Sequence, residues 1–219
     1  MSSPLASCPA CGGELQFKSR SSVLTICSFC NSMVVRHDLK LEDLGKVTGM
    51  PEDLSPIRIG TKGIYNNVAF EVIGRQKIGW ENGSWNEWFL VFDDRTNGWL
   101  SDAQGFYFMS RQVTHPGNVP ELPRLMVGRA ATVEGIKYKV EDIRPVTCIG
   151  LEGEVSLQSP IGRESISVDL LGLTSLAASI DYAVHPKGSI KEEPPRVFVG
   201  AYVEFEDLNF SNLRAFDGW

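Results

Sequence analysis

The sequence has no hydrophobic segment that is long enough to cross a membrane. Its longest apolar runs are only four or five residues, and the run from Trp88 to Phe92 is one of them, whereas a membrane-spanning helix needs about 20 apolar residues. The first six residues also lack the basic patch and apolar stretch of a secretory signal. We therefore expect a cytoplasmic protein without membrane insertion.

Positive charge and histidine are also scarce. The chain has 21 Lys and Arg against 27 Asp and Glu, for a formal net charge of −6, which argues against a general nucleic-acid binder. The three histidines, His37, His115 and His185, stand in no spaced metal motif, and no Gly-x-Ser-x-Gly elbow or Gly-rich phosphate loop occurs. No catalytic motif in the sequence therefore supports an enzyme. A hydrolase remains an alternative only because a Ser/His/Asp triad can assemble from residues that are distant in sequence.

Cysteine is scarce after residue 30 but dense before it. Four of the five cysteines form two Cys-x-x-Cys pairs, Cys8 with Cys11 and Cys27 with Cys30. Two such pairs with a spacer of this length are typical of a site that binds zinc through four thiolates. Because such a site has no open coordination position, we expect one structural zinc ion. A pair of disulfides is the alternative, but disulfides are rare in reducing compartments.

The residues around these pairs predict a zinc ribbon over residues 1–38. Apolar side chains alternate on both sides of the polar turn 19–22, which is typical of a β-hairpin, and Met33 to Val35 would supply a third strand. Such a short unit cannot build a sufficient core alone, and metal binding would contribute about 10–16 kcal/mol to its folding. The fifth cysteine, Cys148, is expected to be a small buried apolar residue.

Residues 39–56 are interpreted as a linker. Leu41, Leu44 and Val47 have the spacing of a short amphipathic helix, and Gly45 and Gly49 limit its length. The remainder of this segment reads as an irregular connector, so we place the domain boundary at its end.

An internal repeat follows the linker. Ile59-Gly60 recurs as Val127-Gly128, and each glycine is followed after ten residues by an aromatic residue, Phe70 or Tyr138, so the copies are 68 positions apart. Each copy reads as strand, two-residue turn, strand, and no amphipathic helix of a dozen residues occurs after residue 56. We predict a mainly β fold in which the zinc ribbon is followed by two tandem, related halves, each a small SH3-like β-barrel or a sandwich. The first half covers residues 57–120 and the second covers residues 121–219.

The first half contains a dense block of tryptophan and acidic residues. Indole faces and carboxylates that share one cavity would bind a basic, polyamine-like ligand. The alternative, which we prefer from the sequence, is that the rings fill a core while the acidic pair makes a turn. The residues of this candidate ligand or partner surface are Trp85, Glu87, Trp88, Asp93, Asp94 and Trp99.

Three blocks of sequence carry a resemblance to a known family. They are Ser55-Pro56-Ile57-Arg58-Ile59-Gly60, Trp85-Asn86-Glu87-Trp88-Phe89-Leu90 and Gly98-Trp99-Leu100-Ser101-Asp102. With them the chain resembles, over nearly its whole length, the bacterial family known as domain of unknown function 4178, in the version with an N-terminal zinc ribbon. The resemblance implies a soluble cytoplasmic protein linked to membrane-associated or stress-related systems, and it brings no catalytic residues.

Three functional hypotheses follow from these observations. The preferred one is a non-catalytic interaction or adaptor module, in which the ribbon and exposed strand edges dock onto protein partners. The first alternative is a sensor that binds a small ligand, such as a polyamine-like cation, through the tryptophan-rich half. The second alternative is a hydrolase of unrecognised type. A cavity lined by aromatic and polar residues would favour the sensor.

Overall fold

The computed structural model describes residues 5–37, 40–47, 49–51, 53–156, 161–184 and 193–216. Across this part of the chain the structure is mainly β, with fifteen strands and two single turns of 3-10 helix, η1 (Leu122–Arg124) and η2 (Glu206–Leu208). The prediction of a mainly β fold is therefore confirmed. Neither of the described helical turns is long and apolar enough to cross a membrane.

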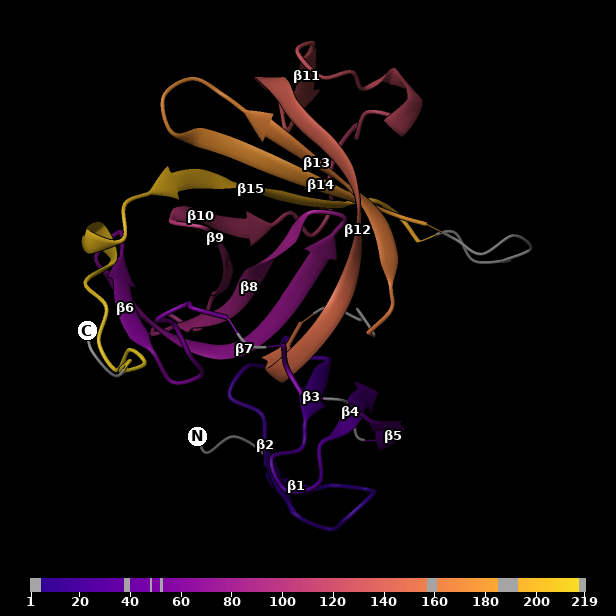
Figure 1. Ribbon diagram of the computed structural model, residues 1–219, viewed down its shortest axis with the longest axis vertical. Helices are drawn as coiled ribbons and strands as arrows, with labels where there is room; N and C mark the ends of the chain where they lie inside the picture. Colours follow the sequence, from indigo (N-terminus) through magenta and orange to yellow (C-terminus); the bar gives the residue numbers. More distant parts are fainter. Residues whose placement is uncertain are drawn as a thin grey trace.

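The N-terminal unit consists of two small antiparallel sheets. Its strands are β1 (Leu5–Ser7), β2 (Glu14–Gln16), β3 (Leu24–Ile26), β4 (Ser32–His37) and β5 (Lys40–Lys46). β1 pairs with β2, while β4 lies between β3 and β5. One Cys-x-x-Cys pair follows β1 and the other follows β3 (Figure 1), as in the ribbon layout expected from the sequence.

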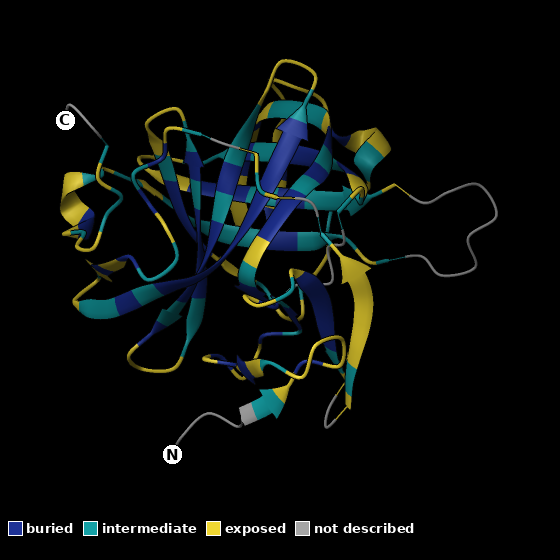
Figure 2. Cartoon of the chain, turned by 60° about the horizontal axis from the view of Figure 1, so that its bottom comes forward, coloured by how far each residue is buried: buried dark blue, intermediate teal, exposed yellow. Residues whose placement is uncertain are grey.

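The short helix expected at Leu41, Leu44 and Val47 is wrong, because residues 40–46 form strand β5. β5 pairs in antiparallel register with β4, and Leu41 lies opposite Arg36. An isolated helix of so few residues is unstable in water, whereas the edge of β4 offers backbone hydrogen-bond partners. Leu44 is 47% exposed, so the spaced apolar residues of this segment do not form a buried face. β5 is an exposed edge strand (Figure 2).

Eight longer strands form a closed antiparallel ring. They are β7 (Val68–Trp80), β8 (Gly83–Phe92), β9 (Asn97–Ala103), β10 (Phe106–Gln112), β12 (Ile136–Val155), β13 (Glu164–Leu171), β14 (Leu176–Ala183) and β15 (Arg196–Val203). Strands β7–β10 pair in sequence order, as do β12–β15, and the two groups join at both edges through the pairs β7–β12 and β10–β15. The two expected halves are therefore parts of one sheet, because the edge strands of each satisfy those of the other (Figure 1).

Two shorter strands flank the ring at matching places. β6 (Lys62–Tyr65) pairs with β7, and β11 (Ala130–Val133) pairs with β12. The turns between these strands, Asn66-Asn67 and Glu134-Gly135, all have positive φ angles, as tight two-residue hairpins require. Backbone hydrogen bonds of 2.8 Å recur with the same offset, from Gly60 N to Val72 O and from Gly128 N to Val140 O.

Glycine allows the ring to close at both joins. Gly74 lies in β7, where a Cβ atom would stand 1.4 Å from the backbone oxygen of Glu154 in β12. Gly200 lies in β15, where a Cβ atom would stand 1.9 Å from the backbone oxygen of Met109 in β10. The two pairs of edge strands thus approach one another more closely than any side chain allows.

Apolar residues pack on the outer face of the ring in two clusters. The cluster on β7–β10 includes Trp88 and Leu90 and is covered by η2 and the segment that follows it. The cluster on β12–β15 includes Val168 and Ile180 and is covered by β11 and the segment around η1. These outer cores leave the inner face of the ring free for polar residues.

The ribbon continues the sheet of the ring, because β3 pairs with β12. A shared apolar cluster holds Leu24 and Val35 of the ribbon against Phe89 and Val146 of the ring. The ribbon is therefore packed onto the ring and does not depend on its own core alone.

A buried carboxylate from the ring reinforces this junction. The side chain of Glu154 in β12 accepts hydrogen bonds from the backbone amide of Lys18 at 2.8 and 3.0 Å, from the amide of Ser19 at 3.3 Å and from the hydroxyl of Ser22 at 2.6 Å. Burial raises the pKa of Glu154, against the opposing effect of these hydrogen bonds. The loop between β2 and β3 is thereby held on the ring.

Candidate ligand cavity and four-cysteine cluster

The ring encloses a cavity of about 270 Å³ to which every one of its eight strands contributes side chains. Alternate residues of each strand point inward, as the two-residue period of a β-strand requires. The inward set combines aromatic rings, serine hydroxyls and charged groups. It includes Gln76, Trp85, Glu87, Trp99, Ser101, Phe106, Phe108, Ser110, Arg144, Arg163, Ser165, Ser167, Asp169, Ser179, Asp181, Arg196, Phe198 and Tyr202.

Three of the six residues of the predicted tryptophan and acidic block lie in this cavity. They are Trp85, Glu87 and Trp99. The ring of Trp99 packs against Phe89, with centroids 4.9 Å apart, and against Phe198, with centroids 6.4 Å apart. The geometry therefore brings part of the block together on the inner face, as the ligand-binding alternative requires.

The other three residues of the block lie elsewhere. Trp88 belongs to the outer apolar cluster and is fully buried, and the guanidinium of Arg75 lies over its ring at 4.7 Å from the centroid. Asp93 and Asp94 are exposed in the turn after β8, where the Asp94 carboxylate accepts hydrogen bonds from the amide and hydroxyl of Thr96. These three residues fit the core-and-turn alternative.

Glu87 and Gln76 meet inside the cavity. The Glu87 carboxylate accepts hydrogen bonds from Trp85 Nε1 at 3.1 Å and from Gln76 Nε2. Burial raises the pKa of Glu87. The side-chain oxygen of Gln76 is buried without a hydrogen-bond partner, and it is the single side-chain atom of this kind in the part of the chain that the structure describes. Since buried polar groups are normally paired, this acceptor could receive a hydrogen bond from a donor inside the cavity.

Asp169 is a second acidic residue of the cavity, and its carboxyl takes part in no hydrogen bond or ion pair among the described residues. Burial raises its pKa to about 6, and the nearby Asp142 adds to the effect, whereas the positive charge of Arg144 opposes it. The charge of Asp169 also raises the pKa of Glu87, so the two carboxyl groups lie close enough to interact.

The arginines of the cavity are already paired with carboxylates. Arg163 donates to Asp181 through both terminal nitrogens, at 2.6 and 3.2 Å. Arg196 pairs with Glu193, which also pairs with Arg163 at 3.3 Å. Arg144 pairs with Asp142 in the next but one position of β12, and its guanidinium lies over the ring of Trp80.

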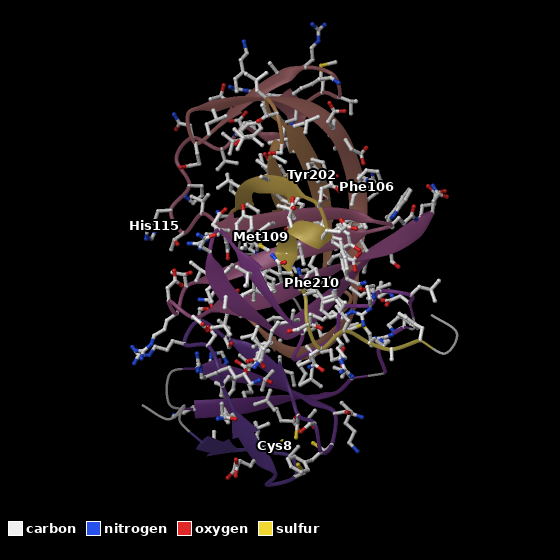
Figure 3. The ribbon with its side chains drawn as sticks, turned by 90° about the vertical axis from the view of Figure 1, so that its left-hand side faces the viewer. Cys8, Phe106, Met109, His115, Tyr202 and Phe210 are labelled. Carbon is white, nitrogen blue, oxygen red and sulfur yellow. The ribbon has the colours of Figure 1, made fainter. Side chains whose placement is uncertain are left out.

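Aromatic side chains mark the opening of the cavity to solvent. Phe106 is 71% exposed and Tyr202 is 43% exposed, although both line the cavity. Figure 3 shows these two side chains near one another, and the ring of Tyr202 packs against Phe108 with centroids 5.6 Å apart. A ligand that enters here would pass between apolar rings.

The described residues assemble no hydrolytic pair in the cavity. Neither His37 nor His115 lines it, and Figure 3 places His115 away from Phe106 and Tyr202. His185 lies outside the described residues. Cys148 lines the cavity, but burial raises the pKa of its thiol to about 11, which leaves the thiol protonated and unreactive at neutral pH.

A second polar cluster lies on the outer face of β7 and holds the connector in place. Asp53 of the connector pairs with Arg75 and with Lys77, the latter at 2.7 Å. Lys77 also donates to the backbone oxygen of Pro51 at 3.2 Å. Because these groups satisfy one another, the cluster fits a structural role.

The four N-terminal cysteines come together in a cluster that could hold one metal ion. Their sulfur atoms lie within 4.8 Å of one another, with 3.8 Å between Cys8 and Cys30 and between Cys11 and Cys27. All four are free thiols, so the disulfide alternative is wrong. Cys8 lies far from the opening of the cavity (Figure 3).

Sequence reasoning found one side of the cavity and missed the other. Gln76, Asp169, Asp181 and the serines of β13 were not predicted as site residues. A signal was present in β13, where Ser165, Ser167 and Asp169 alternate with apolar residues, because a strand with a buried outer face and a polar inner face has this pattern. The pattern alone does not indicate that the polar face lines a cavity.

Comparison with known proteins agrees with the resemblance seen in the sequence. No curated protein and no solved structure matches the chain. A family model described as domain of unknown function (DUF4178) matches residues 58–205, from just before β6 to just after β15. The match covers more than half of the chain and all eight strands of the ring, so the chain belongs to the DUF4178 family.

Proposed function

We propose that the protein binds a small molecule inside its ring of eight strands. The observation that carries this proposal is the cavity of about 270 Å³ that contains a buried, unpartnered acceptor, the side-chain oxygen of Gln76. An eight-stranded closed sheet has an interior wide enough to hold one small ligand. Apolar rings with a few convergent polar groups are the usual lining of such sites.

The adaptor function expected from the sequence has less support. The most exposed strand edge of the described ribbon is β5, which carries Lys40, Glu42, Asp43 and Lys46. Charged residues on an edge strand oppose the addition of another strand. The lined cavity therefore favours the small-ligand alternative over the adaptor and over the hydrolase.

We also propose that the four cysteines bind one structural zinc ion. A tetrahedral site with zinc–sulfur bonds of about 2.3 Å places its sulfurs about 3.8 Å apart, and two of the sulfur pairs are separated by 3.8 Å. Hydrogen bonds from the hydroxyl and the amide of Ser32 lower the pKa of Cys30 to about 6. A hydrogen bond from the Gly13 amide lowers the pKa of Cys11, but the neighbouring thiols raise it overall to about 12, so a bound cation would be needed to favour the thiolate there. Zinc would supply folding free energy to the ribbon.

We further infer that residues 57–120 and 121–219 are two related copies. The hairpin turns and backbone hydrogen bonds that recur 68 residues apart support this, as do β-bulges after Val72 and after Val140. Replacing Asn66-Asn67 by Glu-Gly, the residues of the matching turn, should change the free energy of unfolding by less than about 0.5 kcal/mol. A larger loss would contradict the relation.

The cavity proposal is tested with a variant that fills the cavity and a matched variant outside it. Ser179 lines the cavity, whereas Ser175 is exposed on the turn before β14. A panel of small molecules is screened for thermal stabilisation of the full chain, of Ser179→Phe and of Ser175→Phe. We expect some compounds to stabilise the wild type and Ser175→Phe but not Ser179→Phe. Stabilisation of all three proteins alike, or of none by any compound, would overturn the proposal.

A further inference from the structure

We propose that the ligand is a small organic cation, a protonated amine on an apolar body. Its N–H groups donate hydrogen bonds to the side-chain oxygens of Gln76, Glu87 and Asp169. This inference rests on the proposed function and names the chemistry of its ligand. It is argued from the polar groups that the cavity leaves unpaired, from its balance of charge and from the rings at its opening.

Some amide and acidic side chains of the described cavity have acceptors without a donor, whereas its serine hydroxyls can accept or donate. The Gln76 side chain is only 4% exposed, and its oxygen has no donor. The Asp169 carboxyl receives no hydrogen bond or ion pair from any described residue, and Glu87 receives hydrogen bonds only from the neutral groups of Gln76 and Trp85. A buried acceptor that stays unpaired costs about 1–3 kcal/mol, so the best ligand brings donors.

The charges around the cavity leave an excess of carboxylates. Its three arginines are held by Asp142, Asp181 and Glu193, which leaves Glu87 and Asp169 without a cationic partner in hydrogen-bond contact. An ammonium group would bring one positive charge to these carboxyls and donate up to three hydrogen bonds. An anionic ligand would have to displace existing ion pairs in order to reach an arginine.

The aromatic side chains fit the remainder of such a ligand. Trp85 and Trp99 lie inside the ring, while Phe106, Phe108 and Tyr202 lie at the opening. Aromatic faces attract cations and cover apolar groups. Burial raises the pKa of the Tyr202 phenol, and the charge of Asp169 adds to this effect, which places a carboxyl close to the aromatic opening.

The ionisation of Asp169 predicts how binding depends on pH. The groups that face it are Asp142 and Arg144 of β12, Glu87 of β8 and Tyr202 of β15. With a pKa of about 6, Asp169 is ionised above that pH and neutral below it. The affinity for an amine should therefore fall by up to about tenfold per pH unit below pH 6, while that for an uncharged analogue stays level.

A series of ligands with one skeleton and three charges tests the proposal. Binding of 2-phenylethylamine, 2-phenylethanol and 3-phenylpropionate to the full chain is measured by calorimetry at pH 7.5. We expect the amine to bind about tenfold more tightly than the alcohol, and the acid to bind most weakly. Equal or tighter binding of the alcohol or the acid overturns the cation assignment but leaves a ligand cavity. Failure of all three to bind overturns the assignment, and the compound panel described above then decides the cavity separately.

Two variants assign the effect to the cavity carboxyl. Asp169→Asn should weaken amine binding about tenfold, change alcohol binding little and remove the pH dependence. Asp94→Asn is the control, because Asp94 is exposed in the turn after β8 and does not line the cavity. Near-ultraviolet circular dichroism confirms that both variants are folded. Unchanged amine affinity in folded Asp169→Asn would overturn the role of this residue.

Discussion

The two groups of strands that make the ring differ on their inner faces and agree on their outer faces. Strands β7–β10 present four aromatic side chains to the cavity, Trp85, Trp99, Phe106 and Phe108. Strands β12–β15 present mostly serines and charged groups, such as Ser165, Asp169 and Arg163. Both groups bury apolar residues on the outside. The two groups of strands therefore share the burial of apolar residues on the outer face and differ in the side chains that they present to the cavity.

The largest effect is expected from a change outside both groups of strands, in the ribbon. Cys27→Ser removes one ligand of the proposed zinc site, which would contribute about 10–16 kcal/mol to the local fold. Zinc content should fall from one equivalent, and residues 5–37 should lose amide protection from hydrogen exchange while the ring keeps it.

Cys148→Ala is the control for this experiment, because Cys148 lies in the ring and outside the cluster. It should retain a full equivalent of zinc. Less than about half an equivalent of zinc in wild-type protein purified without chelators would refute the site. Loss of protection across the ring in Cys27→Ser would show that neither group of strands folds without the ribbon.

The next largest effect is expected where the two groups of strands join. Gly74→Ala would place a Cβ atom 1.4 Å from the backbone oxygen of Glu154, and such overpacking costs about 3 kcal/mol or more. Urea unfolding measures the loss. Gly49→Ala, which meets nothing within 4 Å, is the control, and a small effect of Gly74→Ala would show that the ring does not close as described.

A smaller effect is expected on the pH dependence of the free energy of unfolding, because Asp169 lies on the inner face of the ring and not at an exposed position. The raised pKa of Asp169, about 6, means that the folded state favours its protonated form. The contribution of Asp169 to the free energy of unfolding should therefore fall by up to about 3 kcal/mol as pH rises from 4 to 6. Asp169→Asn should remove this part of the fall, while buried Glu87 and Glu154 keep their own parts. Urea unfolding at pH 4.5 and 7.5 measures both.

Asp94 supplies a control of opposite sign for this pH experiment. Hydrogen bonds from Thr96 lower the pKa of this exposed carboxyl, so its contribution to stability is present at neutral pH and is lost as pH falls through the folded pKa. Asp94→Asn should leave the Asp169-dependent slope in place. If Asp169→Asn shows the same pH slope as wild type, the buried carboxyl is not the source.

The smallest effect on stability is expected at the aromatic opening. Because Phe106 is 71% exposed, Phe106→Ala should change the free energy of unfolding by less than about 0.5 kcal/mol. Its ring lines the cavity, so amine affinity should fall by about two- to tenfold. Leu173→Ala, at a position that is 83% exposed and away from the cavity, should change neither. Equal amine affinity in Phe106→Ala would place ligand entry elsewhere.

The features that could be predicted from the sequence are those made by short segments. The four cysteines lie within 23 residues, so their spacing alone predicted that they would come together. The turns at Asn66-Asn67 and Glu134-Gly135 were predicted for the same reason, since turn geometry depends on two residues. The predicted helix in residues 39–56 failed, because pairing with β4 is a contact that local spacing does not contain.

The cavity was predicted only in part. Trp85, Glu87 and Trp99 were predicted because they belong to a dense block of aromatic and acidic residues. Trp88 was predicted for the same reason, but it lies on the outer face of the ring. Gln76 was overlooked, since nothing in its neighbours indicates a buried oxygen without a donor. A bulge after Val72 shifts the strand register, so the face to which Gln76 points could not be counted from Phe70.

By itself the sequence determined the family, the mainly β character of the chain and the cluster of four cysteines. These depend on composition, on alternation and on ligand spacing, all of which act over a few residues. Only the tertiary structure decided that eight strands close into one ring, and which side chains face its interior. Closure joins β7 to β12 and β10 to β15, strands that are separated by about a third or more of the chain. Pairing over such distances depends on which edges are left without partners, and no local pattern specifies that.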